Sequence, residues 1–224
     1  MIMPILPVAL SRADGVLLLE DGSVKRVIVF IDAQNFYRNA RRAFFDDATG
    51  AHTHGQYRPE AVGAILASRD PDRTPTQVRL YTGRPDANLQ PKAHRANVRQ
   101  CQAWEAAGCF VFHRPLRYPP GWPSVVDGQR PEEKGIDVAM AVDIVRFAHD
   151  RAYDVAIVCT GDTDLIPAIE DVLSAGTGAR VEVAGWKSEH YRQRLSLPGR
   201  NLWCHWLSYA DYRAVEDPTD FAAD

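Results

Sequence analysis

The chain has 224 residues, of which 46% are hydrophobic and 25% charged, a composition typical of a globular protein. A net charge of −3 excludes a protein that binds nucleic acid through a basic field over its whole surface, so such contacts require a local patch. The four cysteines lack CxxC or zinc-ligand spacing, and we expect reduced thiols in a cytoplasmic protein. The apolar N-terminus is too short to span a bilayer and lacks the basic start of a signal peptide.

The predicted elements alternate between strands and helices. Residues 1–25 form an extension, in which an Asp-Gly turn at 21–22 is predicted to join the flanking apolar runs as a hairpin. Apolar runs then predict strands at 26–32, 77–82, 109–113, 154–160 and 180–184. Helical spacing occurs at 35–45, 59–69, 91–108, 136–152 and 164–176, with a last short strand and helix within 201–215. This order predicts one α/β domain over 26–215, a mainly parallel sheet with helices on both faces, and a tail over 216–224.

Acidic residues follow two of the predicted strands. Asp32 ends the run KRVIVFID, and Asp162 and Asp164 lie in CTGDTDLIP, directly after the run YDVAIV. In open parallel sheets, ligands bind outside the carboxyl ends of the strands. If the two strands are neighbours, these three carboxylates share one edge of the sheet. Asp137, in KGIDVAMAVD, lies in the first turn of the helix predicted from residue 136.

Each aspartate also has a structural interpretation. Asp137 could compensate the helix dipole, and Asp162 could be a helix N-cap. Asp32 is harder to explain in this way, because a carboxylate that ends an apolar strand must be solvated, paired or bound to a metal. Several carboxylates at one edge would repel by about 4 kcal/mol per pair at a separation of about 4 Å. A divalent cation would relieve this repulsion, and oxygen ligands favour Mg²⁺ or Mn²⁺.

Three blocks carry a resemblance to a known family: FIDAQNFY, then EKGIDVAMAVDIVRFAHDRAYDVAIVCTGDTDLIPAIE, then ARVEVAGW. In this order they resemble the NYN branch of the PIN-like nucleases, from about residue 27 to 186. The resemblance implies a PIN-like three-layer α/β/α fold, a five-stranded sheet in the order 3-2-1-4-5 and a metal-dependent ribonuclease, more often an endonuclease than an exonuclease. By position, the family's acidic residues fall on Asp32, Asp137, Asp162 and Asp164, and Asn35 matches the polar residue after the first aspartate. Many members have Gly-Asn where this chain has Ala33 and Gln34.

Asp143 also lies in the second block. It is six residues after Asp137, which corresponds to about 240° around a helix, so both side chains cannot face one metal ion. We expect Asp143 to be a surface or supporting residue.

Basic and aromatic residues indicate where a substrate could bind. Arg84, Arg95 and Arg114 lie near the second and third strands, and Tyr118 and Trp122 are in the loop that follows. Cations interleaved with aromatic rings suit single-stranded nucleic acid, and the resemblance implies that this is RNA. The alternative for Arg95 is an ordinary solvated helix face. Arg38 gives a second basic position near Asp32, and Lys134 is either a phosphate contact or a solvated loop charge.

Two rival functions are compatible with parts of this pattern. A phosphatase of the haloacid-dehalogenase type needs a second aspartate two residues after the first, where this chain has Gln34. A PIN-like module that binds RNA or protein without cleavage would be indicated by gaps in the acidic set, and this chain has none. No membrane contact is expected, and self-association into a homo-oligomer is left open.

Overall fold

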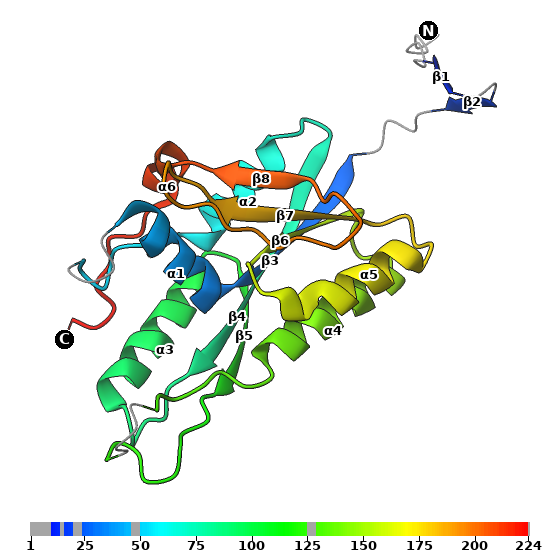
Figure 1. Ribbon diagram of the computed structural model, residues 1–224. Helices are drawn as coiled ribbons and strands as arrows, with labels where there is room; N and C mark the ends of the chain where they lie inside the picture. The colour runs from blue at the N-terminus through cyan, green and yellow to red at the C-terminus, as the bar shows by residue number, and fades with distance from the viewer. Residues whose placement is uncertain (1–9, 14–15, 20–23, 46–49, 125–128, 224) are drawn as a thin grey trace, which may run out of the picture.

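The computed structural model describes residues 10–13, 16–19, 24–45, 50–124 and 129–223. Its body is a six-stranded parallel sheet in the order β5-β4-β3-β6-β7-β8 (Figure 1). The strands are β3 (Lys25–Asp32), β4 (Arg73–Arg84), β5 (Phe110–Pro115), β6 (Val155–Cys159), β7 (Arg180–Trp186) and β8 (Cys204–Leu207). This arrangement confirms the predicted parallel α/β fold and the order 3-2-1-4-5 of its first five strands.

The predicted count of five strands was wrong by one edge strand. β8 pairs in parallel with β7, from Val183 opposite Cys204 to Trp186 opposite Leu207. The sequence predicted a short strand here but not its place in the sheet. Its four residues, CHWL, lack the continuous apolar run that identifies the central strands, because an edge strand is covered less completely than a central one.

The predicted N-terminal hairpin was also wrong in its pairing. β2 (Val16–Leu19) pairs antiparallel with β1 (Leu10–Ala13), and these two strands form a separate small sheet. β3, which was expected to pair with the run at 16–20, instead lies in parallel between β4 and β6. Residues 21–22, the predicted turn, lie outside the described residues. In the sheet, β4 and β6 pair with both edges of β3 and helices cover both of its faces, which a two-stranded hairpin cannot provide.

Helices cover both faces of the sheet. On one side are α1 (Ala33–Phe44), α2 (Pro59–Ser68), α3 (Pro91–Ala106) and α6 (Tyr209–Val215); on the other are α4 (Ile136–His149) and α5 (Ile166–Ser174), preceded by the 3-10 turn η1 (Thr163–Leu165). β3 contributes Val29 to the first layer and Phe30 to the second, and neither has exposed surface. None of the helices in the described part of the chain has the length and apolar character that a bilayer crossing requires.

Candidate active site

The carboxyl ends of β3 and β6 lie side by side at one edge of the sheet. The two strands pair in parallel, with Ile31 opposite Cys159 as the last pair. Asp32 is the residue after Ile31, and Asp162 follows Cys159 by three residues. The predicted neighbourhood of the first and fourth sheet strands is therefore confirmed, and both aspartates stand at the same edge.

A cavity of about 360 Å³ at this edge brings together all four predicted aspartates. We call it the acidic cavity. Its walls come from α1, from the start of α4, from the loop after β6 and from the loop ahead of α4. It is lined by Asp32, Gln34, Asn35, Arg38, Asn39, Arg42, Glu133, Ile136, Asp137, Asp162 and Asp164.

Asp32 is the N-cap of α1. Its carboxylate is one of two in this cavity whose pKa is shifted. Its Oδ1 accepts the backbone N–H of Asn35 at 3.0 Å, and its Oδ2 lies 3.4 Å from Oγ1 of Thr160. Burial raises the pKa of Asp32 to about 6, the Asn35 N–H opposes this rise, and the negative charges of Glu133 and Asp162 add to it. The cost of a buried charge, predicted from the sequence, is thus present, and a cap bond alone does not remove it.

Asp162 and Asp164 lie in a tight turn between β6 and α5. Oδ1 of Asp162 accepts the backbone N–H of Asp164 at 3.0 Å, so Asp162 does cap η1, as its structural interpretation proposed. The N–H of Asp162 in turn donates to Oγ1 of Thr160 at 3.1 Å. Capping uses one carboxylate oxygen of Asp162, which leaves the second oxygen available to a ligand in the cavity.

Asn35 joins the two strand ends. Its side-chain oxygen accepts the backbone N–H of Gly161 at 2.9 Å and the side-chain N–H of Asn39 at 2.8 Å. Both bonds go to protein groups, so this amide fixes the distance between the first turn of α1, directly after β3, and the loop after β6.

Glu133 is a fifth carboxylate of the acidic cavity that the sequence analysis missed. It lies in the loop ahead of α4, where its Oε1 accepts the backbone N–H of Gly83 at the end of β4. Burial raises its pKa, while the Gly83 N–H and Arg38 lower it and Asp137 raises it further. The available signal was the pair of glutamates in EEKGID, which lies a few residues before Asp137.

Asp143 does not reach the cavity, as expected from its position on α4. It accepts hydrogen bonds from Arg79 at 2.7 Å and from the hydroxyl of Tyr81 at 2.8 Å, and it also pairs with Arg146 at 2.9 Å. Arg79 in addition lies over the ring of Phe110, with its Cζ 3.7 Å from the ring centroid. Asp143 therefore anchors α4 to β4.

A larger groove of about 1530 Å³ continues from the acidic cavity between α1, α3 and the end of β4. Its lining includes five cations and several aromatic rings, and we call it the basic groove. It shares Gln34, Arg38, Arg42 and Glu133 with the acidic cavity, so the two spaces are continuous. The cations are Arg38, Arg41, Arg42, Lys92 and Arg130, and the aromatic rings are those of Tyr37, Tyr57, Trp104 and Phe221.

Of the five predicted substrate contacts, Arg38 lines both spaces. Arg84, Arg95, Arg114 and Lys134 line neither, and their contact with a substrate stays a prediction. Arg84 donates to the side-chain oxygen of Asn97 at 3.2 Å, and a Cβ placed on Gly135 would lie 2.8 Å from Nη1 of Arg114. The sequence located the basic residues around α3 but did not show that α1 supplies the opposite wall.

The donor set of the acidic cavity suits a hard divalent cation. In the described ranges, none of the four aspartates forms an ion pair with a basic side chain, although Arg38 and Arg42 line the same cavity. The same ranges contain no group of three or more His, Cys, Asp or Glu already arranged around one metal position. Mg²⁺ is commonly held by one or two carboxylates together with waters and substrate phosphates, so a complete protein cage is not required.

Comparison with known proteins gives a family and a distant structural likeness. The profile of the NYN domain family matches residues 26–196, which runs from the start of β3 past the end of β7. A solved structure of a protein of unknown function from Vibrio parahaemolyticus is 15% identical, with a TM-score of 0.47 over 77% of this chain and 89% of that chain. No curated protein matches the sequence.

Proposed function

The chain belongs to the NYN domain family, whose members are generally nucleases, and from this premise we propose that it is a metal-dependent ribonuclease that cleaves single-stranded RNA as an endonuclease. The reaction is hydrolysis of a phosphodiester bond, in which a water oxygen forms a bond to phosphorus and the bond to the leaving ribose oxygen breaks.

The observation that carries the proposal is the acidic cavity itself. Four aspartates from three separate segments line one small space, and the buried Asp32 has its pKa raised to about 6. Carboxylates kept together in this way are unfavourable unless a ligand compensates their charge. The cavity opens into a groove with five cations, which suits a polyanionic substrate.

The proposed roles follow from the position of each side chain. Asp32, Asp137, Asp162 and Asp164 are the carboxylates that would hold Mg²⁺ or Mn²⁺, with waters and the substrate phosphate completing the ligands. The bound cation supplies Lewis-acid polarisation of the phosphate and a water of lowered pKa. Asn35 keeps the two strand-end loops at a fixed distance through its bond to Gly161.

Arg38 and Arg42 lie where the acidic cavity meets the basic groove. At this junction they are placed to bind phosphates on either side of the scissile bond. The partly exposed ring of Tyr37 on α1 offers aromatic surface along the groove for bases, which a single strand exposes and a duplex does not.

The test is cleavage of labelled single-stranded RNA and DNA by the purified protein with Mn²⁺, Mg²⁺ or EDTA. We expect RNA fragments of internal length with either cation and none in EDTA. Asp162→Asn is the decisive variant, because Asn caps η1 about as well as Asp but lacks the charge. Its cleavage rate should fall at least about a hundredfold while its melting temperature in EDTA stays the same or rises.

Three outcomes would each reject the proposal. Cleavage in excess EDTA would show that the reaction needs no divalent cation. Full activity of Asp162→Asn would show that the acidic cavity is not the active site. Tight RNA binding without cleavage under every condition would favour a non-catalytic binding module.

A cytoplasmic location is proposed alongside the activity, and the free state of Cys101, Cys109, Cys159 and Cys204 supports it.

A further inference from the structure

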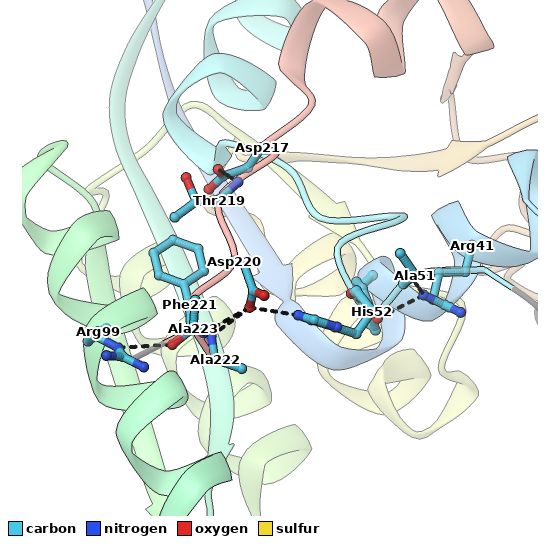
Figure 2. Close-up of polar contacts among 11 residues, drawn as sticks. Arg41, Ala51, His52, Arg99, Asp217, Thr219, Asp220, Phe221, Ala222 and Ala223 are labelled. Atoms are coloured by element: carbon cyan, nitrogen blue, oxygen red, sulfur yellow. Dashed lines mark hydrogen bonds and ion pairs between the residues drawn. The ribbon is translucent and has the colours of Figure 1, made fainter.

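The last described residues of the chain cross the basic groove. We call residues 217–223 the C-terminal strap. It leaves α6 and passes between the loop that follows α1 and the side of α3 (Figure 2). Phe221 and Ala222 of the strap line the groove, together with His52 of the loop and residues of α3 such as Lys92.

The strap is held by few bonds at its outer end. Nε2 of His52 lies 2.8 Å from Oδ1 of Asp220, and Nε of Arg99 donates to the backbone oxygen of Phe221 at 2.9 Å (Figure 2). The side chains of His52 and Asp220 are 60% and 44% exposed. Exposed pairs of this kind contribute little to stability, so the outer end of the strap can detach without unfolding the domain.

The two sides that the strap bridges are themselves well supported. Arg41 of α1 is 8% exposed, and its Nη1 donates to the backbone oxygens of Ala51 at 2.6 Å and His54 at 3.1 Å. These bonds hold the loop that carries His52. The root of the strap is also fixed, because Asp217 is buried and its N–H donates to the backbone oxygen of Gln56 at 3.3 Å. The weak contacts are therefore confined to residues 220–223.

The strap carries the same kinds of chemical group as the proposed ligand of the groove, single-stranded RNA. Its sequence from residue 217, DPTDFAA, contains two carboxylates, one aromatic ring and no basic residue. A single strand of RNA likewise offers negative charge and planar rings. Phe221 and Ala222 line the groove, so the strap's ring lies where a strand would place a base, and Asp220 is held beside the groove by His52.

We propose that the C-terminal strap is an intramolecular competitor that occupies the distal part of the basic groove and must detach before a single strand binds along it. This inference rests on the proposed function, because it takes the groove to be the path of the strand. RNA then binds only the fraction of the protein in which the strap is open, and the apparent dissociation constant rises in inverse proportion to that fraction.

Binding of a short fluorescein-labelled oligouridylate in EDTA, followed by anisotropy, tests the strap without requiring cleavage. Arg99→Ala removes the bond to the strap together with one positive charge of α3. Loss of charge alone would weaken binding of an anion, whereas release of the strap strengthens it. We expect binding about three- to tenfold tighter than for the wild-type protein. Phe221→Ala, which removes the ring from the groove and changes no charge, should act in the same direction.

Arg95→Ala is the matched control. Arg95 is exposed on the same helix, lies one turn before Arg99 and lines neither the groove nor the cavity. It loses the same charge without touching the strap, so its binding should be unchanged or weaker. Tighter binding of Arg99→Ala and Phe221→Ala, but not of Arg95→Ala, supports the strap as a competitor. Weaker binding of Arg99→Ala together with weaker or unchanged binding of Phe221→Ala overturns it.

The strap and the nuclease can fail separately. RNA that is cleaved normally while neither strap variant binds more tightly rejects the strap and leaves the nuclease. Strap variants that bind more tightly without any cleavage in Mn²⁺ support the strap and reject the nuclease. If no variant binds RNA in EDTA, the strap proposal fails, and cleavage in Mn²⁺ decides the nuclease separately.

Discussion

The side-chain oxygen of Asn35 accepts the backbone N–H of Gly161 at 2.9 Å, and this bond joins the ends of β3 and β6 across the acidic cavity. Asn39 donates to the same oxygen at 2.8 Å, and the hydroxyl of Tyr191 donates to Asn39 at 2.7 Å. Asn35 therefore acts as a positioning residue, since its acceptor is used within the protein.

Asn35→Ala should lower both stability and activity. The N–H of Gly161 and the side chain of Asn39 would each lose an acceptor, and an unsatisfied buried donor costs about 1–3 kcal/mol. We expect the free energy of unfolding, measured with urea in EDTA, to fall by that amount, and kcat to fall more than KM rises. An unchanged unfolding free energy would show that water replaces the amide and that the loops do not depend on it.

Asp137 and Asp143, on one helix, should respond in opposite ways to alanine. Asp143→Ala leaves the guanidinium of Arg79 buried without its carboxylate partner, which costs about 3–5 kcal/mol. Asp137→Ala removes a carboxylate that has no ion-pair partner in the described part of the chain, so unfolding in EDTA should change little while RNA cleavage is lost. Urea unfolding and a cleavage assay on both variants measure the contrast. Equal losses of stability would contradict it.

The candidate site could be predicted where it depends on the sheet edge. Asp32 and Asp162 follow apolar runs, and the rule that ligands bind at the carboxyl ends of parallel strands predicts that they share one edge if their strands are neighbours. The resemblance to the NYN family supplied that strand order. Helix periodicity separated Asp137 from Asp143 by local spacing alone.

Glu133, β8 and the strap could not be predicted in this way. Glu133 reaches the cavity because a loop crosses the end of β4 and bonds to Gly83, a contact between residues fifty positions apart in the sequence. β8 is an edge strand without a distinctive apolar pattern, and the strap is placed by isolated contacts to His52 and Arg99. Single long-range contacts of this kind have no periodic signature.

Glu133→Gln should weaken Mn²⁺ binding by about tenfold or more. The amide can still accept the N–H of Gly83, so the loop stays in place while one negative charge of the cavity is lost. Isothermal titration with MnCl₂ measures the effect. A Mn²⁺ affinity equal to that of the wild-type protein would show that Glu133 does not contribute to the metal site.

Gly83→Ala provides an independent route to the same result. A Cβ at this position would lie 2.3 Å from Cδ2 of Leu116 and 2.7 Å from Cγ of Glu133, so the Glu133 side chain would have to move. We expect Mn²⁺ affinity to fall in parallel with that of Glu133→Gln. A fall in Gly83→Ala alone would assign the effect to the loop backbone instead of the carboxylate.

The raised pKa of Asp32 predicts how stability depends on pH without metal. Burial moves this pKa from 3.8 to about 6, so between these values the folded protein binds more protons than the unfolded chain. Stability must therefore fall as pH rises through this window. A shift of about two units corresponds to about 3 kcal/mol, present as a penalty above pH 6 and absent below pH 4. Asp32→Asn keeps the cap to Asn35 but cannot ionise, so it should lack this dependence.

We would measure urea unfolding of the wild-type protein and of Asp32→Asn in EDTA, at about pH 4 and about pH 7. The difference between the two proteins at each pH isolates the contribution of Asp32. The variant should become the more stable of the pair at the higher pH. Excess Mn²⁺ should reverse the order, because a cation that binds only the folded protein, through ionised Asp32, stabilises the wild type as RT ln(1 + [Mn²⁺]/Kd). That gain should grow as pH rises and be much smaller in the variant. If Mn²⁺ stabilises both proteins equally, Asp32 does not hold the cation, whatever its pKa.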